Sequence, residues 1–170
     1  NPAIVMIDEK TGNECMRVID QKGLGGNGEM QWLEKDMLEE LKASGVPVFI
    51  HPTMIRPYGE CENLSFETAS KLIEAGIPVA MQSGYESYVP RARVVLYEAG
   101  MAAANGCSRN DAMRMITIEP ARILGIDDRV GSIEVGKDGD LAMYDDDPFE
   151  WTSHCTGVVI DGAIVASTPR

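Results

Sequence analysis

The sequence predicts an α/β fold in which parallel β/α units are followed by a small antiparallel β segment. Short apolar, β-branched runs indicate buried strands at 3–7, 46–50 and 77–81. The segments Leu41–Ile50 and Leu72–Met81 repeat each other 31 residues apart, which is about the length of one β/α unit. Asp161-Gly162 lies between two apolar runs and indicates a tight hairpin.

The helices follow from the same patterns. Apolar residues recur at helical spacing over about 31–44, 65–75, 90–105, 108–115 and 120–124. In both repeated segments a helix ends at Gly, one residue precedes Pro, and a strand begins. Successive parallel strands joined by helices on this period are expected in a β/α barrel or an open doubly wound sheet. After Asp127 the pattern changes to turns and antiparallel strands.

Composition excludes some classes of partner. The chain has 170 residues, 44% of them apolar, and a formal net charge of −12. Such a charge disfavours nucleic acid and anionic membranes, and no apolar run approaches the roughly 18 residues of a membrane span. The four cysteines form no C-x-x-C pair, so we expect free thiols, and a cytoplasmic location is favoured. The start at Asn1-Pro2 leads us to expect part of a longer or processed protein.

A spaced set of motifs resembles a known family. Ile116-Thr-Ile-Glu-Pro-Ala-Arg-Ile-Leu-Gly125 is followed by Asp128-Arg-Val-Gly-Ser-Ile-Glu-Val-Gly-Lys-Asp-Gly-Asp-Leu141 and by Val158-Val-Ile-Asp-Gly-Ala-Ile-Val165. This order resembles the C-terminal signature of the amidohydrolase superfamily, T-x-N-P-A-x-x-L-G, D-R-x-G-S-I-E-x-G-K-D-A-D-L and V-x-x-x-G-x-x-V. Glu119 replaces the usual Asn, and Gly139 the usual Ala. The residues themselves are mostly turn formers, so they indicate structure. The pair Arg129 and Asp128 is expected to tie the last helix of the barrel to the β segment.

The resemblance implies a fold and its divisions. It implies the last β/α units of a TIM-type barrel over 1–126, of the metal-hydrolase kind. Residues 127–170 would form the C-terminal β segment of a composite sandwich domain. Three strands cannot close a barrel, so we expect this chain to pair with a missing N-terminal half or to form a homo-oligomer.

The same resemblance implies chemistry that this chain lacks. Family members hydrolyse C–N bonds with one or two divalent metals, held by H-x-H on the first strand, His on the fifth and sixth strands, and Asp on the eighth. The metal lowers the pKa of bound water and the Asp takes its proton. Here Asp8-Glu9 follow the strand at 3–7, and Gly84 stands at the position of the catalytic Asp. Glycine has no side chain that binds a metal or moves a proton, so we expect no metal site in this chain and a zinc-type metal only in an active full-length relative.

Four residues are candidates for the remaining site. Glu86 is the catalytic candidate if it replaces the missing carboxylate, although a shift of two residues exceeds the tolerance of a metal site. The imidazolonepropionase-related branch has an Arg, a Glu and an N-x-T/S-F-E helix start here, which match Arg56, Glu60 and Asn63-Leu-Ser-Phe-Glu67. His51, Arg56 and Glu60 are the substrate-binding candidates. The structural alternative for His51 is a histidine that lies in the loop or supports the residues that touch the substrate. For Arg56 and Glu60 it is a salt bridge within the loop.

Two functions fit these residues. The first is a C-terminal fragment of an amidohydrolase-like protein, inactive as this chain alone, whose family hydrolyses non-peptide C–N or amide bonds. The second is a non-catalytic amidohydrolase-like protein with a degenerate active site that binds a small molecule or acts structurally.

Overall fold

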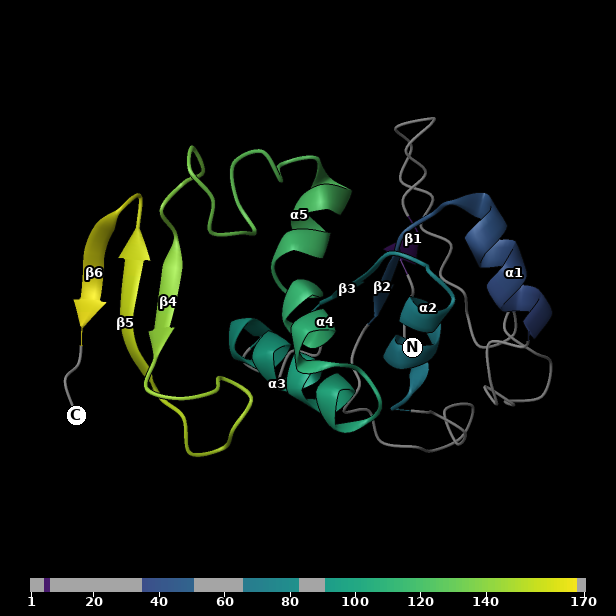
Figure 1. The fold of residues 1–170 in the computed structure, drawn as a ribbon, viewed down its shortest axis with the longest axis horizontal. Helices are drawn as coiled ribbons and strands as arrows, with labels where there is room; N and C mark the ends of the chain where they lie inside the picture. The colour runs from purple at the N-terminus through teal and green to yellow at the C-terminus, as the bar shows by residue number, and fades with distance from the viewer. Residues whose placement is uncertain (1–4, 7–34, 51–65, 83–90, 168–170) are drawn as a thin grey trace. The chain divides into compact units, whose positions relative to one another are not determined.

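The computed structural model describes residues 5–6, 35–50, 66–82 and 91–167. The helices are α1 (Lys35–Ser44), α2 (Thr68–Glu74), α3 (Arg91–Ala104), α4 (Arg109–Arg114) and α5 (Ile118–Leu124). The strands are β1 (Val5–Met6), β2 (Val48–Ile50), β3 (Val79–Met81), β4 (Leu141–Tyr144), β5 (Cys155–Ile160) and β6 (Ala163–Ser167). Figure 1 shows these elements along the chain. Within the described residues, the predicted alternation of helices and strands followed by an all-β segment is confirmed.

The chain divides into two compact units, Asn1–Ile116 and Thr117–Arg170. The first contains one sheet in the order β1-β2-β3, and the second contains another in the order β4-β5-β6. The division falls before α5, whereas the sequence pattern changes after it.

The two repeated segments form parallel neighbours. Val48 pairs with Val79 and Ile50 with Met81 in the ladder between β2 and β3. The N–H of Val48 also donates to the carbonyl of Pro78 at 2.9 Å. Gly45 and Gly76, which end the helices before the two strands, have φ values of 66° and 78°. Glycine adopts this left-handed conformation without the steric penalty of a Cβ, and so the repeated Gly-x-Pro pattern produces the same helix-to-strand turn twice.

The first strand corrects the sequence prediction. β1 pairs with β2 in antiparallel orientation, with Val5 opposite Phe49 and Met6 opposite Val48. The prediction that all three strands run parallel is therefore wrong. An apolar run encodes burial and extension but not direction, because the backbone groups of a sheet edge can bond a neighbour of either orientation.

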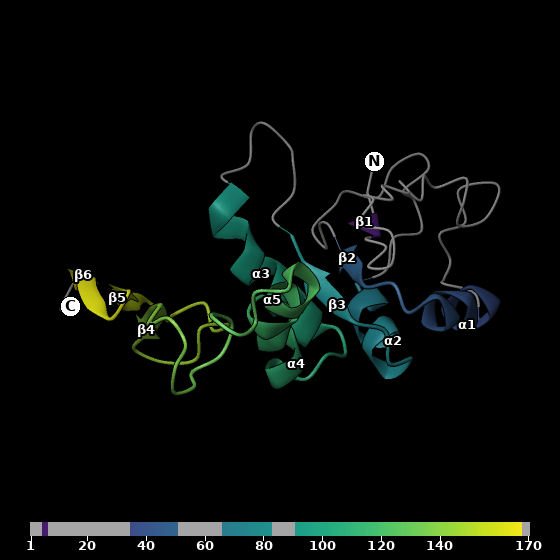
Figure 2. The same ribbon diagram turned by 90° about the horizontal axis from the view of Figure 1, so that it is seen from above.

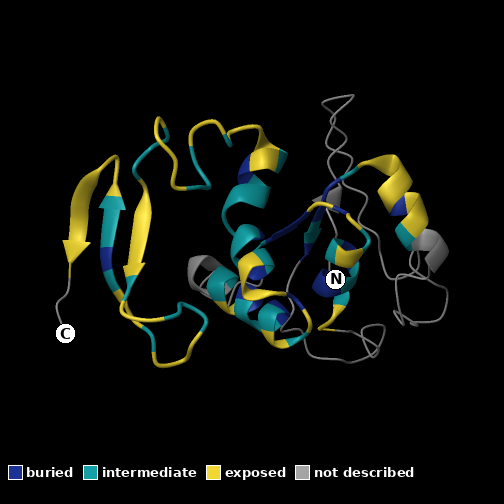
Figure 3. Cartoon of the chain, in the orientation of Figure 1, coloured by how far each residue is buried: buried dark blue, intermediate teal, exposed yellow. Residues whose placement is uncertain are grey.

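The first unit buries its core around β2 and β3. All three residues of β3 are buried, as are Val48 and Ile50 of β2. Leu72 of α2 and Ala99 of α3 have no exposed surface, and Figure 3 shows β3 as a continuous buried strand. Small residues on α3 allow a helix to pack closely, so the apolar spacing read from the sequence corresponds to real burial.

The second unit is a three-stranded antiparallel meander. β5 lies between β4 and β6, with Leu141 opposite Val159 and Ile160 opposite Ala163. Figures 1 and 2 show the three strands as a single narrow layer within this unit. Asp161 and Gly162 form the hairpin turn with φ values of 50° and 75°, as expected for a turn that needs positive φ at both central residues.

Arg129 forms an ion pair with Asp138. Its Nη2 lies 2.6 Å from Oδ2 of Asp138, and its carbonyl accepts from the Asp138 N–H at 2.8 Å. The ion pair with Asp138 raises the pKa of Arg129, to which Asp128 adds only a smaller charge effect. The pair therefore closes the turn-rich segment that precedes β4, because both the backbone and the side chain of Arg129 contact Asp138.

Replacing Ser108 by alanine is expected to destabilise the chain by about 1 kcal/mol. Ser108 caps α4, since its Oγ accepts from the Asp111 N–H at 3.0 Å. Alanine leaves that helix N–H without its partner, whereas threonine in Ser108→Thr keeps a hydroxyl there. Urea unfolding of both variants checks this, and equal midpoints for Ser108→Ala and wild type would contradict the capping role.

Candidate functional site at the carboxyl ends of the parallel strands

Two strand ends lie side by side in the first unit. The N–H of Gln82, just after β3, donates to the carbonyl of Ile50, the last residue of β2, at 3.1 Å. The Met81 N–H donates to the carbonyl of Met115 at 3.0 Å, which fixes β3 to the segment after α4. Sites in parallel α/β folds are built at such carboxyl ends, so this edge is the candidate site.

The predicted site residues follow these two strand ends in the chain. His51, Arg56 and Glu60 come after β2, and Gly84 and Glu86 come after β3. All five lie outside the described residues. The hydrogen bond between Gln82 and Ile50 places the points where these two segments leave the sheet next to each other. The roles assigned to the five residues stay predictions.

The described residues do not fit a self-contained metal centre. Among residues 5–6, 35–50, 66–82 and 91–167, no group of three or more His, Cys, Asp or Glu side chains could hold a metal ion. A structural or catalytic zinc site needs three or four such ligands at fixed distances.

The described cysteines have contrasting surroundings. Cys107 is buried and Cys155 is exposed, and both are free thiols. Burial, helped by the charges of Asp111 and Glu74, raises the pKa of the Cys107 thiol to about 11. Because the thiolate is the nucleophilic form, Cys107 is protonated near neutral pH and is unsuited to nucleophilic catalysis.

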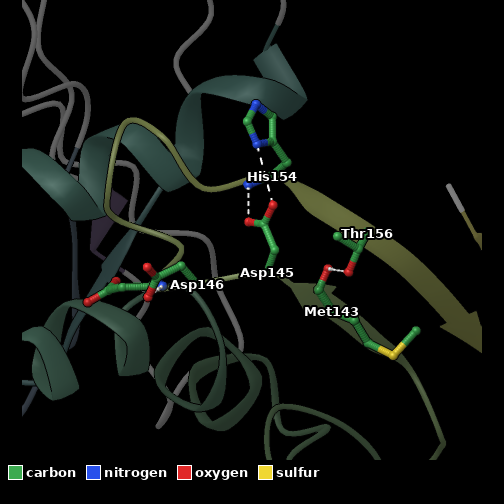
Figure 4. Close-up of polar contacts among 6 residues, drawn as sticks. Met143, Asp145, Asp146, His154 and Thr156 are labelled. Atoms are coloured by element: carbon green, nitrogen blue, oxygen red, sulfur yellow. Dashed lines mark hydrogen bonds and ion pairs between the residues drawn. The ribbon is translucent and has the colours of Figure 1, made fainter. Parts of the chain in front are cut away.

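The second unit contains a polar closure between β4 and β5, which is the set of hydrogen bonds between Asp145 and His154. The His154 N–H donates to Oδ1 of Asp145 at 2.7 Å, and the Asp145 N–H donates to the His154 carbonyl at 3.2 Å. The His154 Nδ1 lies 3.5 Å from Oδ2 of Asp145, and Figure 4 shows the two side chains facing each other. His154 is exposed. This contact joins the residue after β4 to the residue before β5.

Acidification is expected to loosen this closure through Asp145. The hydrogen bond from the His154 N–H, with a smaller effect of the His154 charge, holds the pKa of the Asp145 carboxyl below its ordinary value. A carboxyl with a lowered folded-state pKa stabilises the fold above its unfolded pKa, and this contribution is lost as pH falls through the folded one. We expect the His154 amide to exchange faster on acidification, after correction for intrinsic exchange, as measured by NMR.

Asp145→Asn should remove most of this pH dependence, because an amide does not titrate in that range. Asp128→Asn is the matched control, since Asp128 is exposed and is not among the groups that shift the pKa of Asp145. An unchanged pH dependence in Asp145→Asn would contradict the assignment.

Two residues in the first unit were not predicted from the sequence. Gln82 is a half-buried polar residue at the candidate edge, and the signal was its place as the first polar residue after an apolar strand. Glu98 is 1% exposed and lies on the buried face of α3 with Ala99 and Ala102. Its helical spacing with those alanines predicts burial, but a carboxylate at such a position is normally assigned to the surface.

The described elements define an α/β protein with parallel β/α units and a separate antiparallel sheet. Comparison with protein families gives a match to the amidohydrolase family over residues 23–166. The chain therefore belongs to the amidohydrolase family. This family hydrolyses C–N bonds of small molecules, is generally metal-dependent, and has a TIM-barrel-like α/β fold.

The curated relatives are much longer than the matched region. Imidazolonepropionase of Fusobacterium nucleatum is 30% identical over 81 residues, which cover 47% of this chain and 20% of that protein. N-substituted formamide deformylase of Arthrobacter pascens is 27% identical over 124 residues, covering 62% of this chain and 23% of that protein. The chain thus spans about a fifth to a quarter of the length of these two relatives.

Solved structures also match most of this chain but only about a third of their own length. An amidohydrolase from Thermotoga maritima is 31% identical with a TM-score of 0.70, covering 78% of this chain and 34% of that one. A 5-methylcytosine deaminase from Klebsiella pneumoniae is 17% identical with a TM-score of 0.59, covering 79% and 37%; this second likeness concerns the fold alone. No described helix is both long and apolar enough to cross a membrane.

Proposed function

We propose that this chain is the C-terminal part of an amidohydrolase-like protein that acts on non-peptide C–N or amide bonds, and that it is inactive alone. The observation that carries the proposal is the family match over residues 23–166, combined with coverage of only about a fifth to a quarter of the two curated relatives. A metal-dependent hydrolase needs ligands from several strands of its barrel. A chain that supplies only the last strands of the barrel holds too few of these metal ligands.

The inactivity rests on the missing carboxylate. Gly84 occupies the position at which the resemblance places the proton-transferring Asp. The described residues add no metal-binding group to replace the ligands of earlier strands. In this proposal a zinc-type metal belongs to a full-length active relative, and Glu86 is the candidate that would substitute for the Asp.

His51, Arg56 and Glu60 are proposed to bind the substrate. They follow β2, whose carboxyl end is hydrogen-bonded to the residue after β3. Arg offers a planar fork of donors for a carboxylate or carbonyl group, Glu accepts N–H groups, and His can do either. Such groups suit a small polar amide.

We also propose the organisation of the whole protein. Residues 1–126 would form part of the barrel and 127–170 part of a composite sandwich, completed by a missing N-terminal half or by another copy. The uncharged strand β6 supports this, because Ile164 and Val165 are 69% and 55% exposed and open apolar edges favour further pairing. The free thiols of Cys107 and Cys155 suit the cytoplasm.

The second candidate is a non-catalytic binding protein with a degenerate site. Gly84 favours it specifically, because loss of the proton acceptor removes chemistry while leaving a binding surface. In the whole protein, an H-x-H motif after the first barrel strand would favour the enzyme, and its absence would favour the binding protein.

The test is hydrolysis of amide probes by the purified chain. N-benzylformamide and hydantoin, a linear and a cyclic amide, are incubated with the chain with and without added zinc, and product is measured by chromatography. We expect no turnover above the protein-free blank for wild type or for Glu86→Gln. Zinc-dependent turnover by wild type would overturn the inactivity, and its loss in Glu86→Gln would identify Glu86 as the catalytic carboxylate.

A further inference from the structure

β3 has one side without a neighbouring strand. The described strands of the first unit form a sheet in the order β1-β2-β3, so β3 pairs with β2 on one side only. We call the opposite side of β3 its far side. The backbone groups along such a side can pair with a strand of another chain unless a helix or loop covers them.

The backbone of β3 shows which groups point to the far side. The N–H of Gln82 donates to the Ile50 carbonyl at 3.1 Å, and the carbonyl of Pro78, four residues earlier, accepts from Val48 at 2.9 Å. Both residues therefore face β2. Adjacent residues of a strand direct their backbone groups to opposite sides of that strand, so the N–H of Met81 points to the far side.

The end of α4 occupies this position. The Met81 N–H donates to the Met115 carbonyl at 3.0 Å, and Met115 is the residue that ends α4. The last carbonyls of a helix have no partner within the helix. One hydrogen bond therefore satisfies both a carbonyl at the end of α4 and an N–H on the far side of β3.

The side chain of Met115 anchors this contact. It is 1% exposed and is among the largest fully buried side chains of the described residues. Ala112, on the preceding turn of α4, has no exposed surface either. Moving Met115 away from β3 would bring its apolar side chain into water, which is unfavourable, so the carbonyl is held in place.

We propose that Met115 masks the far side of β3, so that a strand of a second copy of this chain can pair there only by displacing it. The inference rests on contacts within the first unit and does not depend on the proposed activity. It adds a condition to the proposed organisation, because any strand that extends the sheet beyond β3 competes with Met115 for the Met81 N–H.

Amide hydrogen exchange of the full chain, followed by NMR, tests the mask in wild type. Gln82 is the internal reference, since its N–H lies on the same strand but is bonded to β2. Unfolding of the sheet exposes both N–H groups, whereas release of Met115 exposes that of Met81 alone. We expect Met81 to be protected to within about ten-fold of Gln82, after correction for intrinsic rates. Protection of Gln82 without protection of Met81 would overturn the mask.

Met115→Ala removes the anchor. We expect exchange of Met81 to become about ten-fold faster relative to Gln82, as for the loss of one hydrogen bond, whereas Met115→Leu keeps the buried volume and the wild-type ratio. Leu72→Ala is the matched control, because Leu72 is also fully buried but lies on α2. It should speed exchange of both N–H groups equally. The same ratio in Met115→Ala and Leu72→Ala would contradict the anchoring role of Met115.

Sedimentation velocity over a range of protein concentrations tests the consequence. We expect Met115→Ala to form more dimer than wild type, Met115→Leu or Leu72→Ala, because it alone uncovers the far side of β3. Association caused by a weakened core would appear in Leu72→Ala as well. Equal dimer formation in Met115→Ala and Leu72→Ala would overturn the claim that Met115 keeps a second copy from pairing with β3. The wild-type exchange measurement remains decisive for the mask if Met115→Ala does not fold.

Discussion

Gly131→Ala is expected to lower the free energy of unfolding of the unit Thr117–Arg170 by about 3 kcal/mol, combining backbone strain and overpacking. Gly131 has a φ of 92°. A Cβ there would lie 2.9 Å from the Ala121 Cβ and the Ile118 Cα, and 3.0 Å from the Thr117 carbonyl oxygen. Two of these atoms are backbone, so the helix α5 would have to move. Amide hydrogen exchange of β5 as a function of urea measures the change.

Gly136→Ala is the control for the close contact between Gly131 and α5. Gly136 has a similar φ of 97°, but a Cβ there meets nothing within 4 Å. The same substitution therefore introduces the backbone strain alone and is expected to cost about 1 kcal/mol. Equal losses in the two variants would contradict the packing of Gly131 against α5.

Leu72→Ala is expected to lower the free energy of unfolding of the first unit by about 3 kcal/mol. Leu72 lies on α2, has no exposed surface, and is among the largest fully buried side chains of the described residues. Its removal leaves a cavity, because the packed surroundings relax only partly. Urea unfolding followed by circular dichroism measures the loss.

Leu124→Ala gives the same chemical change at an exposed position. Leu124 is 60% exposed at the end of α5, so the substitution is expected to change stability by less than about 0.5 kcal/mol. A loss in Leu72→Ala no larger than in Leu124→Ala would contradict the described core.

Local patterns predicted much of the fold. The Gly-x-Pro repeats predicted the parallel pair β2 and β3, and Asp161-Gly162 predicted the hairpin between β5 and β6. Each of these signals acts over a few residues, where backbone sterics decide the conformation. The direction of β1 and the choice of Asp138 by Arg129 depend on which distant groups meet, and no local pattern encodes that.

A departure from the family pattern has a local explanation. Gly139 replaces the usual Ala, and its carbonyl accepts from the Gly162 N–H at 3.0 Å. A Cβ at Gly139 would lie 2.9 Å from that same nitrogen. The glycine therefore allows the hairpin turn to approach the segment before β4 more closely than an alanine would in this arrangement.

The candidate site was predicted less completely than the fold. The resemblance predicted site positions at His51, Arg56, Glu60, Gly84 and Glu86. The structure describes only the strand ends that precede them. Gln82 was missed because a single polar residue after an apolar strand is also the ordinary sign of a strand end. Its face and its backbone bond to Ile50 required the pairing register.

The central claim is that this chain supplies the closing strands of an amidohydrolase without a metal centre of its own. Zinc stoichiometry tests it most directly: the purified chain is equilibrated with zinc, dialysed against metal-free buffer, and measured by inductively coupled plasma mass spectrometry. The account predicts zinc well below one equivalent per chain, with no change in Glu86→Gln. One tightly held equivalent, lost in Glu86→Gln, would contradict it.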